Sequence, residues 1–137
     1  MYTRIGIFGV NEILDFVGPV IRKSGISKKG NPFTYSYPSY RKEYMGKSIK
    51  MGSQRYVLFK LKGVDCIECG LKGKFFALES NYPDKDVWHM NLYGYDKDGN
   101  EVMMTKDHII AKSKKGKNNL DNYQPMCYNC NQEKSNK

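Results

Sequence analysis

The chain has 137 residues, of which 39% are hydrophobic and 27% charged. The length fits one folded domain, with or without a small extension, and the composition excludes a disordered chain. The formal net charge of +9 is uneven, because residues 1–60 carry 11 Lys and Arg against 3 Asp and Glu, whereas residues 61–137 carry 12 against 11. This imbalance favours a polyanionic partner such as nucleic acid, held mainly by the N-terminal half, although a solvated basic surface would account for charge alone. There is no apolar run of about 18 residues and no signal-peptide pattern, so no membrane association is expected, and the expected location is the cytoplasm.

In chain order, the first predicted element is a short strand over residues 2–9. Asn11 is a candidate N-cap for a short helix over residues 12–17, which the following Gly-Pro pair would end. Residues 24–32 are rich in Gly, Ser and Lys and predict a loop. Residues 33–45 then interleave aromatic and polar side chains, as a strand does, until a proline interrupts the pattern.

Residues 54–62 (QRYVLFKLK) predict another strand, because apolar side chains recur on both faces of a two-residue repeat. Residues 87–96 and 101–109 predict two antiparallel strands, since the Asp98-Gly99 pair between them is a strong hairpin signal. Residues 111–122 predict a basic loop, and residues 127–134 a short terminal helix.

The four cysteines form two C-x-x-C pairs, Cys66 with Cys69 and Cys127 with Cys130. Each pair forms a knuckle that points two sulfurs at one centre, and two knuckles supply the four thiolates of a closed tetrahedral zinc site. Four thiolates leave no open position, so the predicted zinc is structural rather than catalytic. The alternative is two redox or disulfide pairs, which an intracellular setting disfavours.

A group of polar residues surrounds the second cysteine pair. Asp107 and His108 stand together at the predicted end of a strand, Asn122 follows in the loop, and Asn131 comes directly after Cys130. A histidine can take a proton from water at neutral pH. A carboxylate and an amide oxygen with open positions beside them suit Mg²⁺. Since neighbouring strand residues point to opposite faces, Asp107 and His108 can address one phosphate only if the strand ends or bends there.

This arrangement resembles the HNH, or ββα-metal, endonucleases, in the zinc-stapled branch that includes phage endonuclease VII-like and homing nucleases. The resemblance covers about the last third of the chain plus the first cysteine pair. It implies an α+β fold with a zinc-bound ββα-metal catalytic module. Two departures are a longer segment before Asp107 and an Asn, rather than a His, at position 131, which the family accepts.

The resemblance also implies roles for these residues. His108 would be the general base, Asp107 and Asn131 would hold a catalytic Mg²⁺ or Mn²⁺, and Asn122 would bond the backbone near His108. The metal would stabilise the leaving 3′ oxygen, which predicts 5′-phosphate and 3′-hydroxyl ends. The phage relatives point to a phage-encoded protein acting in the host cell.

Basic residues in two regions are candidate DNA contacts. They are Lys112, Lys114, Lys115 and Lys117 in the loop after His108, and Arg41, Lys42 and Arg55 in the N-terminal half. A solvated loop is the alternative for the lysines. The tyrosines of residues 33–45 could stack on bases, although core packing is favoured for most of them.

The sequence therefore predicts two parts. Residues 1–63 form a basic extension that grips DNA or sets specificity, and residues 64–137 form the zinc-stapled HNH nuclease domain. The alternative is a zinc ribbon that binds nucleic acid without cutting it, which requires neither His108 beside an acid nor an Asn after the last cysteine. The motif does not say which DNA is cut. One such site cuts one strand, so a double-strand break needs a homodimer or two successive nicks.

Overall fold

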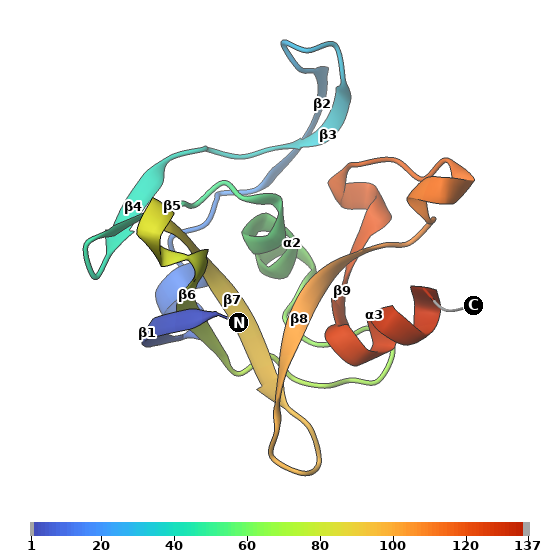
Figure 1. Cartoon of the computed structure of the whole chain (residues 1–137). Coiled ribbons are helices and arrows are strands. Elements are labelled where there is room, and N and C mark those ends of the chain that lie inside the picture. The colour runs from blue at the N-terminus through green and yellow to red at the C-terminus, as the bar shows by residue number, and fades with distance from the viewer. Residues whose placement is uncertain (1, 136–137) are drawn as a thin grey trace.

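The computed structural model describes residues 2–135 and has a mixed α+β architecture, as predicted. A five-stranded antiparallel sheet contains both halves of the chain (Figure 1). Its order is β1 (Thr3–Gly9), β6 (Phe75–Tyr82), β7 (Val87–Tyr95), β8 (Glu101–His108) and β9 (Tyr123–Cys127). Two separate hairpins consist of β2 (Ile21–Ile26) with β3 (Pro32–Ser36), and β4 (Arg41–Tyr44) with β5 (Lys47–Lys50).

Three α-helices and three single 3-10 turns complete the described chain. The helices are α1 (Val10–Leu14), α2 (Gln54–Lys62) and α3 (Tyr128–Ser135). The 3-10 turns are η1 (Pro83–Lys85), η2 (Lys112–Lys114) and η3 (Leu120–Asn122). The predicted strand at the N-terminus and the predicted C-terminal helix are confirmed as β1 and α3. Among the described residues, no helix is long and apolar enough to cross a membrane.

The predicted hairpin of residues 87–96 and 101–109 is confirmed as β7 and β8. In the turn, Asp96 Oδ1 accepts hydrogen bonds of 2.9 Å from the backbone N–H groups of Asp98 and Asn100, and Gly99 takes a φ of 83°. The two strands pair only from the turn as far as Tyr93 and Met103. Beyond that point β8 pairs with β9 instead, from Met104 to His108. Strands β7 and β8 therefore diverge like the arms of a fork, and α2 lies between them (Figure 1).

The segment predicted as a strand over residues 54–62 is helix α2, and that prediction was wrong. Four consecutive residues, from Tyr56 to Phe59, are buried. This happens because α2 fills the fork and packs against β8 and β9, and Tyr56 OH accepts the N–H of Met90 on β7 at 2.9 Å. A short helix that is covered on several sides has apolar residues around most of its circumference, so its sequence also fits a two-residue repeat.

The end of α2 is defined by a glycine and two lysines. Gly63 takes a φ of 100°, which is in the left-handed region that ends helices. Lys60 Nζ donates to the carbonyl of Leu14 at 3.0 Å, and Lys62 Nζ donates to the carbonyl of Tyr123 at 2.6 Å. The two lysines therefore link α2 to the N-terminal half on one side and to β9 on the other.

Two smaller predictions in the N-terminal half need correction. The first helix spans Val10–Leu14 and begins after Gly9, so Asn11 lies inside it instead of capping it. Its start is stabilised by Glu12, whose Oε1 accepts the N–H of Gly9 at 3.2 Å. The loop predicted for residues 24–32 is shorter, because its ends belong to β2 and β3.

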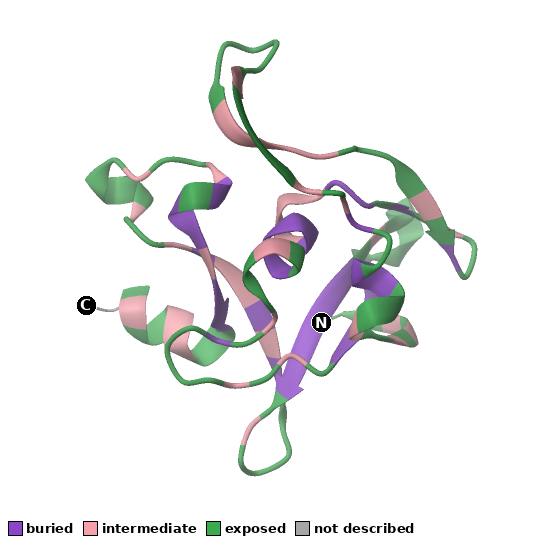
Figure 2. Ribbon diagram, turned by 180° about the vertical axis from the view of Figure 1, so that it is seen from behind, coloured by how far each residue is buried: buried purple, intermediate pink, exposed green. Residues whose placement is uncertain are grey.

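One hydrophobic core joins the two halves of the chain, and Figure 2 shows its buried residues on the central strands and on α2. Residues on both sides of position 63 supply its largest fully buried side chains. These include Ile13, Ile49 and Val57 from the first half and Phe76, Leu78, Met90, Met104 and Tyr123 from the second. The long segment between the first cysteine pair and Asp107 supplies β6 and β7, which form the middle of the sheet. A functional boundary at residue 63 remains a prediction.

Candidate active site and zinc centre

The four cysteines meet at one point between two segments of the chain. Their Sγ atoms all lie within 4.8 Å of one another. Cys66 and Cys127 are buried, Cys130 is half-buried and Cys69 is exposed. The Sγ atoms of Cys69 and Cys127 are 3.8 Å apart, far beyond a disulfide bond length. Four converging sulfurs match the donor set of a structural zinc site, so the cluster could hold zinc.

Backbone hydrogen bonds shape and connect the two knuckles. The N–H of Gly70, which has a φ of 79°, donates to the carbonyl of Cys66 at 2.9 Å and closes the first turn. The N–H of Ile67 donates to the carbonyl of Pro125 at 2.9 Å and joins the first knuckle to β9. Burial opposes ionisation of Cys66, but backbone N–H groups, that of Cys127 first, outweigh it and lower the pKa of this thiol to about 7. A thiolate is the form that a metal ion binds.

Asp107 and His108 are the last residues of β8, opposite Gln124 and Tyr123 on β9. Asp107 is buried, and its Oδ2 accepts from Gln124 Nε2 at 2.9 Å and from Lys134 Nζ at 2.6 Å. Lys134 also donates to the carbonyl of His108 at 2.6 Å, so this side chain of α3 fixes the end of the strand. Among the described residues, no hydrogen bond engages Asp107 Oδ1. That oxygen is therefore available as an acceptor or ligand.

The His108 ring is held by two neighbours. The edge of Tyr123 packs against it, with ring centroids 5.0 Å apart and an interplanar angle of 87°. Its Nε2 lies 2.8 Å from Asn118 Oδ1. An amide oxygen can only accept, so this contact favours the tautomer that has its proton on Nε2 and its lone pair on Nδ1. Asn118 stands ten residues after His108 in the loop, and no motif in the sequence pointed to this contact.

Asn122 bonds the backbone of the loop that follows His108. Its Oδ1 accepts the N–H of Ile110 at 2.8 Å, while its Nδ2 donates to the carbonyls of Ile110 at 3.0 Å and Lys117 at 2.9 Å. The carbonyl of Asn122 also accepts the N–H of Ile109 at 2.7 Å. Because Asn122 is itself buried, these contacts hold the start and the end of the loop together.

Asn131 approaches the end of β8 from α3, one residue after Cys130. Its Nδ2 donates to Thr105 Oγ1 at 2.9 Å, and Thr105 in turn donates to the carbonyl of Met126 at 2.7 Å. The nitrogen of the amide is thereby occupied, and the Oδ1 of Asn131 is left as a free acceptor. Half-burial and the adjacent knuckle restrict this side chain further.

Asp107, His108 and Asn131 all line one cleft of about 800 Å³. The strand ends at His108, and this lets two consecutive residues of β8 reach the same cavity. Lys112 and Lys114 line it as well, whereas Lys115 and Lys117 do not. This cavity is called the cleft below.

Comparison with known families identifies the segment that forms the cleft. Residues 95–137 match the family model HNH endonuclease. This segment is an HNH domain. The match begins at the end of β7 and includes Cys127 and Cys130, but not the first cysteine pair, and it does not single out the zinc-stapled branch. A search of curated proteins and a search of solved structures returned no match.

The oxygen donors of the HNH domain fit a divalent cation. Asp107 and Asn131 line the same cleft, and within residues 2–135 no hydrogen bond engages the Oδ1 atom of either, one a carboxylate and the other a neutral amide oxygen. Hard cations such as Mg²⁺ take oxygen ligands of these kinds and complete their shell with waters and substrate phosphates. The cysteines, by contrast, form a separate set of soft ligands with no open position.

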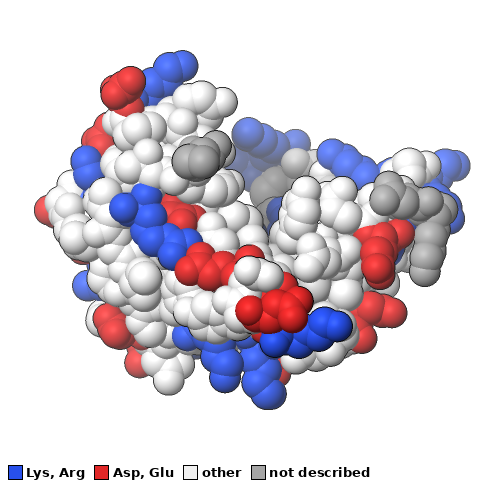
Figure 3. Space-filling model, turned by 60° about the horizontal axis from the view of Figure 1, so that its bottom comes forward, with Lys and Arg blue, Asp and Glu red and all other residues white. Residues whose placement is uncertain are grey.

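The other predicted DNA contacts lie outside the cleft. The Nε of Arg41 donates to Ser48 Oγ at 2.7 Å, and the ammonium of Lys42 lies 4.1 Å from the centre of the Phe16 ring. Arg55, on α2, lines a second cavity next to the HNH domain. On the face shown in Figure 3, basic and acidic side chains are interspersed, so the excess positive charge does not form one continuous patch there.

Proposed function

We propose that this protein is a metal-dependent DNA endonuclease that hydrolyses phosphodiester bonds, with His108 as general base and Asp107 and Asn131 as ligands of Mg²⁺ or Mn²⁺. One observation carries the proposal: these three side chains line a single cleft of the HNH domain, although Asn131 comes from a different element. The expected products have 5′-phosphate and 3′-hydroxyl ends.

His108 is suited to accept a proton from the attacking water. With Nε2 donating to Asn118, the ring presents an unprotonated Nδ1, and the edge contact with Tyr123 limits its rotation. A base that is already oriented loses little freedom when the reaction begins. Asn122 supports this arrangement, since it holds the loop that begins directly after His108.

Asp107 and Asn131 supply the oxygens that would hold the cation. A divalent cation bound there would act as a Lewis acid and stabilise the charge that develops on the leaving 3′ oxygen. Lys112 and Lys114 line the same cleft and can contact the phosphates on either side of the cut. Because Asn131 follows Cys130 directly, the zinc centre would keep this ligand in register with β8.

The test is cleavage of supercoiled plasmid in the presence of Mg²⁺. Replacing His108 by Ala should slow cleavage about 10²- to 10⁴-fold, which is the contribution expected of a general base. Replacing Asn131 by Ala should also abolish most activity, whereas Asn129→Ala, an exposed position in the first turn of the same helix, should cut like wild type. Zinc content and circular dichroism establish that each variant is folded.

The form of the product carries further information. Open circles that accumulate first indicate one site nicking one strand, and early linear product indicates a dimer. If wild type and His108→Ala shift DNA in a gel but neither cuts plasmid, branched or sequence-specific DNA, the nuclease proposal is wrong. The protein would then be a zinc-ribbon nucleic-acid-binding module.

A further inference from the structure

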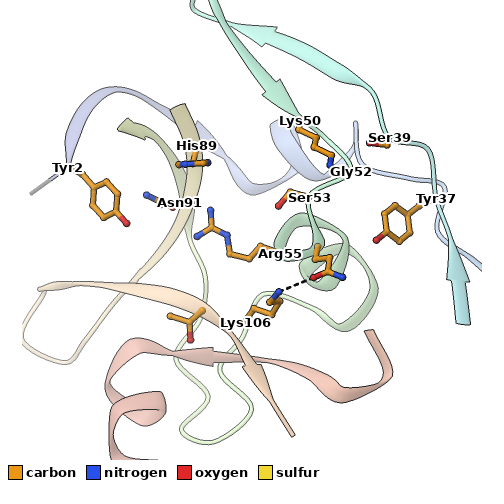
Figure 4. A pocket seen from close by; sticks show the side chains of 12 residues that line it. Tyr2, Tyr37, Ser39, Lys50, Gly52, Ser53, Arg55, His89, Asn91 and Lys106 are labelled. Carbon is orange, nitrogen blue, oxygen red and sulfur yellow. Dashed lines mark hydrogen bonds between the residues drawn. The ribbon is translucent and has the colours of Figure 1, made fainter. Parts of the chain in front are cut away.

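A second cavity, larger than the cleft, lies in the fork between β7 and β8. It has a volume of about 990 Å³ and is called the fork pocket here (Figure 4). His89 lines it from β7, Lys106 from β8 and Arg55 from the start of α2. Figure 4 shows the Arg55 side chain extending across the middle of the pocket, between α2 and β7. None of these positions belonged to the predicted catalytic motif.

Cations of the fork pocket have no acidic partner. Its lining includes Lys50, Arg55 and Lys106 but no Asp or Glu. Within residues 2–135, neither Arg55 nor Lys106 forms an ion pair, and their polar contacts are neutral: Arg55 donates to the carbonyl of Met90 at 3.3 Å and Lys106 to Gln54 Oε1 at 3.0 Å. Cations that crowd together without an anion favour binding of one.

The fork pocket and the cleft adjoin at β8. Lys106 lines both cavities, and it directly precedes Asp107. Thr105 lines the fork pocket and accepts the hydrogen bond that orients Asn131. A strand with one phosphate in the cleft therefore has neighbouring nucleotides within reach of the fork pocket.

Two tyrosines flank the cations. Tyr2 is exposed and lies on the same side of the pocket as His89, and the half-buried Tyr37 lies on the opposite side (Figure 4). A basic groove with aromatic rings at its sides is the arrangement that binds single-stranded nucleic acid, since bases stack on the rings while the phosphates meet the cations. In a duplex the bases are stacked on one another, so only an unpaired stretch leaves its bases free to stack on these rings.

We infer that the fork pocket binds an unpaired stretch of the nucleic-acid strand that is cut, with Arg55, Lys106 and Lys50 on its phosphates and Tyr2 or Tyr37 against a base. The inference rests on the proposed function and deepens it, because it names the substrate class: DNA that is branched or locally unpaired beside the cut.

The experiment measures binding rather than cleavage. In the His108→Ala background, fluorescence anisotropy compares a labelled duplex that carries a single-stranded arm with the corresponding blunt duplex over a series of salt concentrations. Arg55→Gln should weaken binding of the armed DNA about tenfold and lower the salt slope by about 1. Arg22→Gln is the matched control, because Arg22 also lies in the basic half but pairs with Asp121, away from the fork pocket.

A second variant guards against misfolding of the first. Lys50 is exposed on β5, so Lys50→Gln should fold normally. It should also weaken binding of the armed DNA, as Arg55→Gln does. Equal losses of affinity for Arg55→Gln and Arg22→Gln, or equal losses on armed and blunt DNA, would overturn the inference in favour of a diffuse basic surface. The two proposals fail separately. If the wild-type protein cuts no DNA but Arg55→Gln selectively weakens binding of the armed DNA, the inference about the fork pocket stands and the nuclease proposal fails.

Discussion

The cleft and the fork pocket share Lys106, yet they are built in opposite ways. All residues of the cleft lie between Lys106 and Ser135, whereas those of the fork pocket come from five separate stretches of the chain. The cleft combines an acid with a base and several lysines, while the fork pocket has cations and no acid. The comparison teaches that the candidate catalytic groups come from one continuous segment of the chain. The proposed strand-binding surface beside them is assembled by packing of segments that are distant in the sequence.

Loss of the zinc centre should have the largest effect, and mainly on the cleft. Cys127→Ser removes one buried thiolate at the junction of β9 and α3. Structural zinc contributes on the order of 10 kcal/mol to folding in small domains, so we expect loss of bound zinc and of cleavage. Metal analysis and plasmid cleavage measure this, with Tyr128→Phe, at the exposed start of α3, as the control that keeps both.

The same variant tests the contrast between the two cavities. Lys50 and Arg55 lie on β5 and α2, which come before the first cysteine pair. Binding of a single-stranded arm should therefore fall less than cleavage does. If binding and cleavage are lost together, the fork pocket depends on the zinc as much as the cleft, and the contrast does not hold.

A smaller effect separates two asparagines of the loop beside the cleft. Asn122→Ala deletes three partly buried hydrogen bonds to the loop backbone and should cost about 1–3 kcal/mol of stability, measured by urea unfolding. Asn118→Ala deletes one exposed contact and should change stability by less than about 0.5 kcal/mol. It should nevertheless lower kcat about tenfold at unchanged KM, because the His108 ring loses its orienting partner.

Rescue distinguishes orientation from a general structural role. Asn118→Asp keeps an oxygen acceptor and should recover much of the rate. If Asn118→Ala instead unfolds at lower urea while keeping its kcat, the residue only braces the loop.

The smallest effect is expected at Lys134. Its ammonium lies 2.6 Å from Asp107 Oδ2, and with 36% of the side chain exposed this ion pair is partly screened by solvent. Lys134→Met keeps the apolar stem and removes a cation that competes for Asp107. Binding of Mn²⁺, followed by electron paramagnetic resonance, should therefore tighten about three- to tenfold. Weaker binding would contradict this and show that Lys134 positions Asp107 for the metal.

Local patterns were enough to predict much of the C-terminal half. The Asp98-Gly99 turn and its flanking apolar runs predict β7 and β8, because a hairpin is specified by neighbours in the sequence. The two cysteine knuckles and the group of Asp107, His108 and Asn131 carry the resemblance to HNH endonucleases, and the family match over residues 95–137 agrees with it. Such groups can be recognised because the chemistry fixes residue types and spacings within short segments.

The tertiary structure decided the features that depend on contacts between distant segments, namely the conformation of residues 54–62 and the strand partners of β8. Residues 54–62 have the alternation of a strand, and they are helical because the fork buries them on several sides and leaves the N–H of Met90 for Tyr56 to satisfy. No local pattern signals that β8 changes its partner from β7 to β9 at Met103 and Met104, and that change opens the fork pocket. The sequence by itself was enough to single out the candidate metal ligands and the candidate base, because they stand in short motifs. Only packing decided which cations stand together, because their proximity arises from contacts between segments far apart in the chain.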